Sequence, residues 1–425
     1  MMFFLIIGLF FFFALNVPIA FSMILTSLLY LVIKGDIPLI GVVQQIAVGT
    51  DKYLLLAIPF FFLAGELMNA GGIMDRLVRL SKALVGHIPG GLGHVNVVES
   101  MIFAGMSGSA VSDVTAMGFI EIEMMRRMGY SSGFAAAVTG ASATIGPVIP
   151  PSIPFVVYGG ITGVSVGKLF LGGIVPGVLM GIFLMAAVYL IAIKRGYERS
   201  KRPLLLTILK EIFQAIPILI LPFIIIGGIL SGVFTPTEAA VVAAVYAFFL
   251  GTIVLKATDI KEVFRLMIRV GLSTAKLMFI IAAASLFGWI MARENAPLLM
   301  TKAFLSLSNN PYVVLLLINI LLLILGCVME TIAIMVILVP ILTPLVQSLG
   351  IDLVHFGVMI TLNLMIGLLT PPVGMVMYAV ISIAKVSVVE FTKEGLPFII
   401  ALFAVLILIT YMPSFVLWVP NLLLK

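Results

Sequence analysis

An internal repeat constrains this chain more than any other feature of its sequence. Glycines, prolines and apolar residues recur at one fixed offset of 221 residues, without a gap over about 70 residues. The matching positions are Gly105 with Gly326, Ile120 with Ile341, Gly129 with Gly350, Ile145-Gly146 with Ile366-Gly367, Pro150-Pro151 with Pro371-Pro372, and Pro176 with Pro397. Because glycine and proline interrupt regular backbone, matching them matches chain geometry as well as composition. We therefore expect two copies of one architecture.

Both copies are too apolar for a soluble domain. Hydrophobic residues make up 62% of the chain and charged residues only 10%, whereas an average soluble domain is about 25% charged. This composition excludes a soluble enzyme, a nucleic-acid-binding domain and a disordered chain. At about 20 apolar residues per span, 425 residues allow roughly ten to fourteen membrane elements. The predicted fold is an all-α polytopic membrane protein in a lipid bilayer, with no nucleic-acid partner.

Basic residues set the predicted topology. The block 194–211 carries six Lys/Arg and separates the two halves. With this block in the cytoplasm and one re-entrant hairpin in each half, eighteen Lys/Arg face the cytoplasm and six face the other side. The N-terminus then lies inside, the C-terminus outside, and residues 3–33 form one long first span. The two copies are inverted relative to each other, which is a design of secondary transporters, although a channel can also be built from repeats.

Each half contains a polar turn between two short helices. In the first half, residues 90–128 are interrupted at 107–113, and in the second half residues 311–349 are interrupted at 326–331. Arms of about 16 residues reach only about 24 Å, which is too short to cross the bilayer. We therefore predict two re-entrant hairpins with an acid at each tip, Asp113 and Glu330. The alternative for Glu330 is a helix cap or a lateral salt bridge.

Each half also contains prolines inside an apolar stretch, over 131–163 and 352–384. Proline frees a backbone carbonyl in the preceding turn, and non-helical backbone survives at membrane depth only when buried in protein or lining a wet cavity. Freed carbonyls beside Ser/Thr hydroxyls suit a small hard cation such as Na⁺, and N–H groups at helix starts suit a carboxylate. Helix packing explains a single serine equally well, but both kinds of break recur in both halves, which favours function.

At these positions the sequence resembles the large membrane subunit of tripartite ATP-independent periplasmic (TRAP) transporters, over essentially the whole chain. The most specific stretches are 105–113, 140–160, 326–331 and 367–372, and within the family the chain looks closest to the sialic-acid type. The resemblance implies an elevator, in which a mobile transport domain with both hairpins slides against a scaffold. It also implies Na⁺ coupling through at least two sites, a separate small four-helix membrane subunit, and a soluble periplasmic substrate-binding protein.

The resemblance also divides the chain into scaffold and transport parts. The expected segments are scaffold helices with an interfacial segment (36–50) at 1–72, an amphipathic arm helix at 73–87, the first transport-domain repeat at 88–193, a cytoplasmic basic linker at 194–211, further scaffold helices at 212–292, a second arm helix at 293–310, and the second transport-domain repeat with a C-terminal helix at 311–425. Glu66, in a span at 53–72, is expected to pair with a basic group or to stabilise a packing contact.

Carried over by position, the resemblance implies two Na⁺ sites and a substrate site between the tips. The first Na⁺ site would use Ser107, Gly108, Ser109 and Gly146, and the second would use Gly326, Glu330, Thr331, Gly367 and Thr370. The substrate would meet Ser107, Ser109, Asp113 and Ser152. No lysine or arginine lies at either tip, so backbone N–H groups and Na⁺ would have to neutralise a substrate carboxylate.

The predicted function is Na⁺-coupled import of a small organic acid, with sialic acid as the first choice, across a bacterial inner membrane. The alternatives are a TRAP subunit for C4-dicarboxylates, a stand-alone Na⁺-coupled dicarboxylate carrier of similar architecture, and a channel. An intramembrane enzyme would need a nucleophile with a base or paired catalytic carboxylates, and the prediction is that the chain is not an enzyme.

Overall fold

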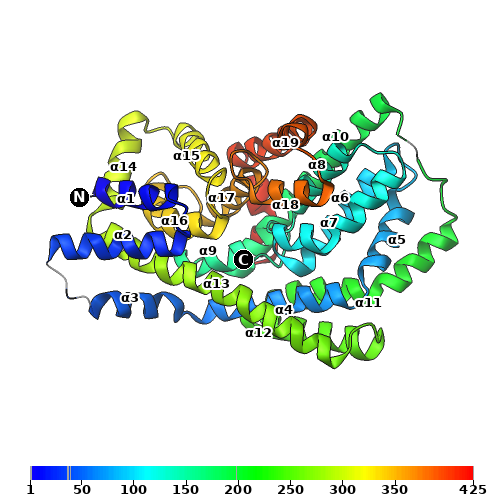
Figure 1. The fold of residues 1–425 in the computed structure, drawn as a ribbon, viewed down its shortest axis with the longest axis horizontal. Helices are drawn as coiled ribbons and strands as arrows, with labels where there is room; N and C mark the ends of the chain where they lie inside the picture. The colour runs from blue at the N-terminus through cyan, green and yellow to red at the C-terminus, as the bar shows by residue number, and fades with distance from the viewer. Residues whose placement is uncertain (1, 36–37, 39, 198, 425) are drawn as a thin grey trace.

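The computed structural model describes residues 2–35, 38, 40–197 and 199–424 (Figure 1). Within these ranges the regular elements are helices and no strand occurs. The all-α fold class predicted from the sequence is confirmed. Residues 36, 37 and 39 of the expected interfacial segment, residue 198 of the basic linker, and the terminal Met1 and Lys425 lie outside the described ranges.

The two sequence copies fold into matching series of helices. The first series is α6 (Gly91–Ser107), α7 (Ala110–Arg127), α8 (Ser132–Ala143), α9 (Ile153–Thr162) and α10 (Val166–Arg195). The second series is α15 (Pro311–Gly326), α16 (Thr331–Ser348), α17 (Leu353–Gly367), α18 (Met375–Ala384) and α19 (Val388–Tyr411). In each, a helical hairpin is followed by a helix broken at the paired prolines and then by a long helix with one internal proline. The 221-residue offset therefore reflects a repeated chain path.

The first apolar stretch is two helices, so the prediction of one long span over residues 3–33 is wrong. α1 (Met2–Ala14) ends before Asn16, which adopts the left-handed conformation at φ 64°. α2 (Ile19–Lys34) begins directly after Pro18, and α1 packs back against it. Proline restricts the residue before it to extended backbone and cannot donate to the preceding turn, so the helix cannot run through this point.

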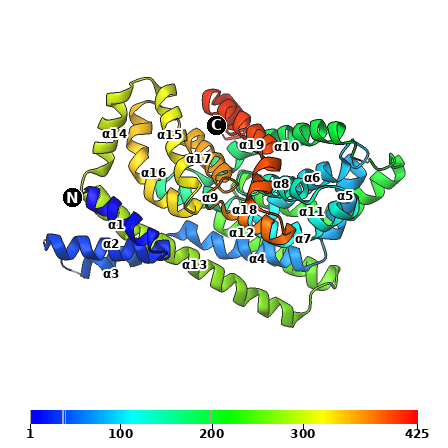
Figure 2. The ribbon, with the colours of Figure 1, turned by 45° about the horizontal axis from the view of Figure 1, so that its top comes forward.

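Helices from outside the two series form a layer along one side of them (Figures 1 and 2). This flanking layer consists of α2, α3 (Ile40–Thr50), η1 (Tyr53–Leu56) with α4 (Ala57–Ala70), α12 (Pro236–Phe249) with the π-helical η2 (Leu250–Val254), and α13 (Ile260–Arg293). α13 has 34 residues and is about 50 Å long at 1.5 Å per residue. It contacts α2, α3 and α4 within the layer and α16 of the second series, while η1 and α4 contact the first series.

The remaining helices are α5 (Met74–Val85), α11 (Leu205–Leu230), α14 (Ala296–Leu307) and α20 (Ser414–Leu423). α5 buries Leu77 and Leu80 and contacts α6 and α11, while Leu84 on the same predicted face is exposed. Among the described residues, seven helices are long and apolar enough to cross a membrane, or eight if α14 and α15, which meet at 119°, count as one span. The other apolar helices have 10–17 residues and include both halves of the broken helix of the second series, α17 and α18.

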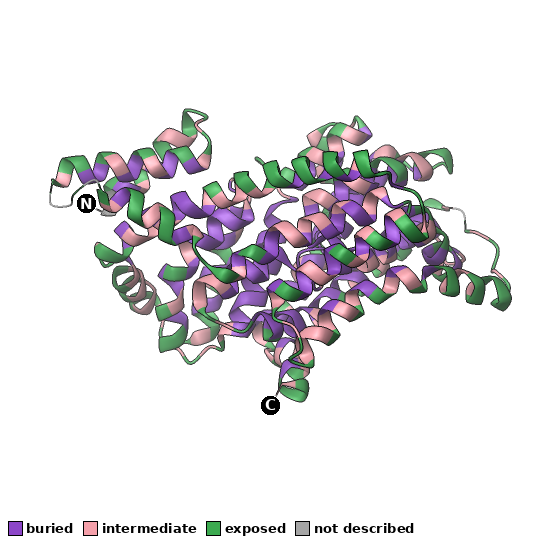
Figure 3. Ribbon diagram, turned by 90° about the horizontal axis from the view of Figure 1, so that it is seen from below, coloured by how far each residue is buried: buried purple, intermediate pink, exposed green. Residues whose placement is uncertain are grey.

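The outer helices present large apolar side chains, whereas the buried residues fill the middle of the molecule (Figure 3). Leu204, Leu206, Phe213 and Phe223, at the start of α11 and along it, are each at least 70% exposed. Apolar side chains at this density are unfavourable in water but make favourable contacts with lipid tails or with another apolar subunit. The apolar surface of the outer helices thus agrees with the membrane protein that the composition predicts.

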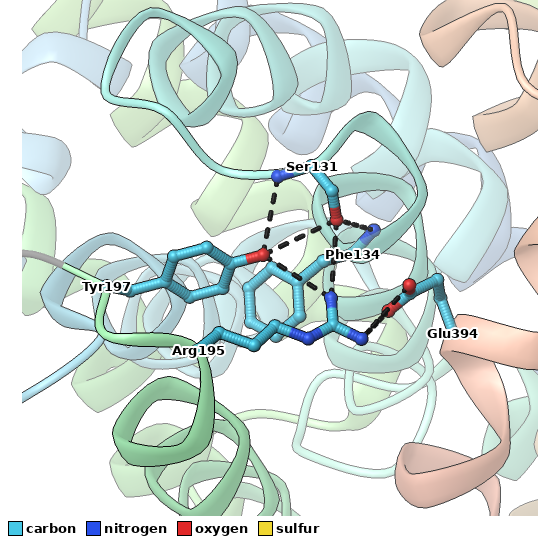
Figure 4. Close-up of polar contacts among 5 residues, drawn as sticks. All are labelled: Ser131, Phe134, Arg195, Tyr197 and Glu394. Carbon is cyan, nitrogen blue, oxygen red and sulfur yellow. Dashed lines mark hydrogen bonds and ion pairs between the residues drawn. The ribbon is translucent and has the colours of Figure 1, made fainter.

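A polar cluster joins the end of the first series to the second series (Figure 4). Arg195, the last residue of α10, places one guanidinium nitrogen 2.8 Å from a carboxylate oxygen of Glu394 on α19. Its other terminal nitrogen donates to the hydroxyls of Ser131 and Tyr197, each at 3.4 Å. Ser131 also caps α8 by accepting from the Phe134 N–H. This Arg195 cluster therefore fixes three helices at one end of the repeats.

We expect the Arg195 cluster to contribute measurably to stability because the Glu394 side chain is only 17% exposed. In a double-mutant cycle of Arg195→Gln and Glu394→Gln, the coupling energy should be about 0.5–1 kcal/mol. The measurement is equilibrium unfolding in mixed detergent micelles. The pair Arg127–Glu123 within α7 is a matched control, because its side chains are 77% and 39% exposed, and its coupling should lie near zero. A coupling at Arg195 no larger than that of the control would contradict the assignment.

Candidate functional site

The first hairpin tip is a tight turn pressed against the first broken helix. Ser107 ends α6, Gly108 is left-handed at φ 61°, and Ser109 caps α7 by accepting from the Ser112 N–H at 3.4 Å. A Cβ at Gly108 would lie 2.6 Å from the Pro151 carbonyl oxygen. Only glycine therefore satisfies both the backbone conformation and the close approach.

The first break, between α8 and α9, brings Gly146 under the same tip. A Cβ on Gly146 would be 3.7 Å from the Ser109 carbonyl oxygen, so four residues predicted for one cation site lie together: Ser107, Gly108, Ser109 and Gly146. The hydroxyl of Ser107 is buried and has no hydrogen-bond partner among the described residues. A buried hydroxyl without a partner is costly, so the Ser107 oxygen is a candidate to meet a ligand at this tip.

The second tip meets the second break backbone to backbone. A Cβ on Gly367 would lie 2.7 Å from the Gly326 Cα. The Cys327 carbonyl accepts from the Val373 N–H at 2.9 Å, and the Cys327 Sγ lies 2.9 Å from the Thr370 hydroxyl. Gly326, Gly367 and Thr370 are therefore brought together as the sequence predicts.

Thr331 and Glu330 lie on the far side of the second tip, at the start of α16. The Thr331 hydroxyl is buried with no partner among the described residues. Glu330 caps α16, because its carboxylate accepts from the N–H groups of Ile332 at 2.9 Å and Ala333 at 3.1 Å. The capping alternative for Glu330 is thus the role that the structure gives it.

Equivalent amide contacts hold each hairpin to its broken helix. Asn96 of α6 accepts from the Ser142 hydroxyl of α8 at 2.7 Å, and Asn319 of α15 accepts from the Asn363 amide of α17 at 2.7 Å. Ser142 and Asn363 occupy matching positions in the repeat. Buried amide contacts between helices are specific, and one such contact holds each hairpin to its broken helix. The Oδ1 of Asn363 has no partner among the described residues.

A cavity of about 460 Å³ lies where the two tips meet the flanking layer. The first copy supplies Gly108, Ser109, Ala110, Val111, Pro147, Ile153 and Pro154, the second copy supplies Glu330, Thr331, Ile332, Met365, Leu368 and Met375, and the layer supplies Phe62, Ser273, Lys276, Leu277 and Ile280. Polar groups thus converge from both tips on an otherwise apolar space. This is the usual composition of a site for a small solute.

Three of the four predicted substrate residues, Ser107, Asp113 and Ser152, are not among the described residues that line this cavity. Ser152 is fully buried at the start of α9, where its hydroxyl donates to the Pro147 carbonyl and accepts from the Phe155 N–H. Asp113 is 2% exposed and one of its carboxylate oxygens has no partner among the described residues. Neither is among the described residues that line the cavity. The structure brings Ser109 to the cavity but not the other three.

Lys276 is the cavity residue that the sequence analysis missed. It projects from α13, far along the chain from either tip, so a search restricted to the tips overlooks it. The signal was a single lysine within the apolar run 271–292. An ionisable residue inside a membrane segment is a functional candidate by default.

A second hollow, of about 310 Å³, adjoins the cavity along α13. Ser109 and Ser273 line both spaces, and Glu66 of α4 and Arg269 of α13 line only the second. The Arg269 guanidinium lies 3.5 Å from the Glu66 carboxylate. Glu66 thus pairs with a basic group, as expected from the sequence.

Comparison with known proteins identifies the family. The family described as the tripartite ATP-independent periplasmic transporter, DctM component, matches residues 6–415. The sialic acid TRAP transporter large permease protein SiaM of Vibrio cholerae is 44% identical over 409 residues, which cover 96% of each chain. The sialic acid TRAP transporter permease protein SiaT of Haemophilus influenzae is 41% identical, over 96% of this chain and 67% of its own length. The C4-dicarboxylate TRAP transporter large permease protein DctM of V. cholerae is 39% identical, over the whole of this chain and 98% of its own.

A solved structure shares the fold. The YdaH transporter of Alcanivorax borkumensis superposes with a TM-score of 0.54 over 88% of this chain and 87% of its own, at 14% sequence identity. At this identity the likeness concerns the fold alone. The family match and the relatives, all named as permeases, concern the function class. The chain therefore belongs to the DctM component family, the large membrane subunits of TRAP transporters.

Proposed function

We propose that this chain is the large subunit of a Na⁺-coupled transporter that imports sialic acid (N-acetylneuraminate) across the bacterial inner membrane. The observation that carries the proposal is the cavity at which both hairpin tips converge. Two half-sites related by a repeat suit paired cation sites, and the space between them suits the solute. The proposal includes two partners, a small four-helix membrane subunit and a soluble periplasmic substrate-binding protein. The N-terminus lies in the cytoplasm and the C-terminus in the periplasm.

The oxygen atoms at each tip fit a hard monovalent cation. Both unpartnered hydroxyls, of Ser107 and Thr331, stand beside non-helical backbone whose carbonyls are free of helix ladders, and hard cations prefer such oxygens. The first Na⁺ would be held by Ser107, Gly108 and Ser109 with Gly146, and the second by Gly326 and Thr331 with Gly367 and Thr370. Glu330 would act by fixing the start of α16. Bound Na⁺ would supply positive charge next to the substrate.

Na⁺ binding and solute binding would be coupled because the hairpin tips and the solute share one cavity. Each tip rests on its own break through glycine contacts, so the tip and the break form one unit. Na⁺ binding would order the tip and its break, which form part of the cavity surface that the solute contacts. By linkage, Na⁺ and the solute then strengthen each other's binding. The two series would then move together relative to the flanking layer as an elevator, which carries the cavity from one side of the membrane to the other.

The choice of sialic acid rests on the relatives. SiaM and SiaT, at 44% and 41% identity, are named for sialic acid. The second candidate is a C4-dicarboxylate, because DctM of V. cholerae is 39% identical over the whole chain. A cavity of about 460 Å³ is large enough for either acid.

The first prediction concerns uptake by reconstituted protein. Proteoliposomes that contain this chain and its small membrane partner should accumulate labelled N-acetylneuraminate under an inward Na⁺ gradient only when the soluble binding protein is present. Uptake should fall to the background of empty liposomes when K⁺ replaces Na⁺. The proposed sites are specific for Na⁺, so a K⁺ gradient would not drive uptake.

Each alternative has its own outcome in this assay. Uptake without the soluble protein would indicate a stand-alone carrier, and Na⁺-driven uptake of succinate in place of sialic acid would indicate a C4-dicarboxylate transporter. Flux that does not saturate and ignores the Na⁺ gradient would indicate a channel and contradict the proposal.

The second prediction concerns the two unpartnered hydroxyls. Ser107→Ala and Thr331→Val each remove an oxygen ligand without breaking a hydrogen bond to any described residue. The Na⁺ concentration for half-maximal uptake should rise roughly 10-fold or more, since a bond to a charged group contributes about 1.5–3 kcal/mol. Melting temperatures in Na⁺-free buffer should change little.

Thr343→Val is the matched control on the same helix as Thr331. Its hydroxyl donates to the Val339 carbonyl within α16 at 2.6 Å and does not line the cavity among the described residues. Its Na⁺ dependence should equal that of the unmodified protein. Equal Na⁺ dependence in all three variants would remove the hydroxyls from the proposed cation sites.

A further inference from the structure

Lys276 lines the cavity between the hairpin tips from the flanking layer. It is near the middle of α13, about 24 Å from the first residue and about 25 Å from the last at 1.5 Å per residue. Its side chain is exposed and lines the cavity together with residues of both hairpin tips.

Lys276 has no counter-charge in the described part of the chain. No ion pair or hydrogen bond joins it to a described residue. Its neighbours along the layer are occupied, because Arg269 pairs with Glu66 and Lys52 donates to the Gly160 carbonyl at 2.9 Å. The carboxylate that lines the same cavity, Glu330, accepts from two N–H groups of α16. A cation without a partner in an otherwise apolar cavity is unfavourable, so we expect it to face a ligand that compensates its charge.

Some of the donors that the sequence assigns to a carboxylate are already used. Ser109 accepts from the first turn of α7, and Glu330 accepts from the first turn of α16. Both helix starts in the cavity therefore carry their own caps, and each cap lowers the attraction for a further anion. Lys276 is the cation among the described residues that line this space.

We propose that Lys276 selects the anionic substrate by pairing with its carboxylate between the two tips. This inference rests on the proposed function and adds the residue that recognises the acid group. It replaces the expectation that backbone N–H groups and Na⁺ alone neutralise that carboxylate. Because Lys276 belongs to the flanking layer and the tips belong to the repeats, the carboxylate is held from both bodies at once.

Binding to the purified membrane complex tests this role without the soluble protein. The probes are N-acetylneuraminate and its methyl ester, which has nearly the same shape but no carboxylate charge, each titrated at saturating Na⁺. Lys276→Gln should weaken binding of the acid about 10-fold or more and change binding of the ester less than 2-fold. Lys276→Arg should keep most of the affinity for the acid, because it retains the charge.

Two further measurements separate recognition from folding and from Na⁺ binding. Lys261→Gln, an exposed lysine at the start of the same helix, should bind both probes like the unmodified protein. Melting temperature and Na⁺-dependent stabilisation should be unchanged in Lys276→Gln. If Lys276→Gln lost affinity equally for the acid and the ester, or lost affinity for neither, the role of Lys276 would be overturned. The proposed function would remain as long as the unmodified protein shows Na⁺-driven uptake. Absence of that uptake would overturn the proposed function and the role of Lys276 with it.

Discussion

The site depends on one requirement, that backbone polar groups exposed by a helix break at membrane depth must find partners within the protein. Each half of this chain has two breaks, and each break is covered by the other. Gly108 lies against the Pro151 carbonyl, and Gly326 lies against Gly367. Unsatisfied groups in an apolar medium cost several kcal/mol each, so neither break is stable alone. The pairing of breaks places both tips beside one cavity.

The repeat is symmetric in its backbone but not in its charges. Asn96 with Ser142 and Asn319 with Asn363 hold the two hairpins in the same way. Glu99, Asp113 and Glu121 are buried in the first copy, whereas their counterparts in the second copy are Ile320, Ile334 and Leu342. Shared glycines and prolines therefore reproduce the chain path, while the polarity around each tip differs between the copies. Such asymmetry is compatible with two ion sites of unequal affinity on either side of one solute.

The sequence predicts the breaks better than it predicts the contents of the site. Glycine and proline act locally, so the offset of 221 residues locates both tips and both broken helices. The N-terminal break was missed although Asn16 and Pro18 are both turn-forming residues, because the stretches on either side of them are apolar. Asp113 and Lys276 show the limit of local reasoning. The acid next to a tip points into the protein, and the lysine reaches the cavity from a helix that begins about 150 residues farther along the chain. Which faces meet is a property of tertiary packing, which one sequence does not contain.

The contact between the second tip and its break limits how the cavity can be opened. The Cys327 carbonyl accepts from the N–H groups of Val373 and Gly374, at 2.9 and 3.4 Å. A tip that swung away alone would leave these groups without partners, at about 1–3 kcal/mol for each, and would expose two glycine backbones that have no side chains to cover them. The second hairpin is consequently a poor local gate. Moving the hairpin and its broken helix together as one rigid piece would keep these contacts, and the part of the cavity lining that they supply would then travel unchanged.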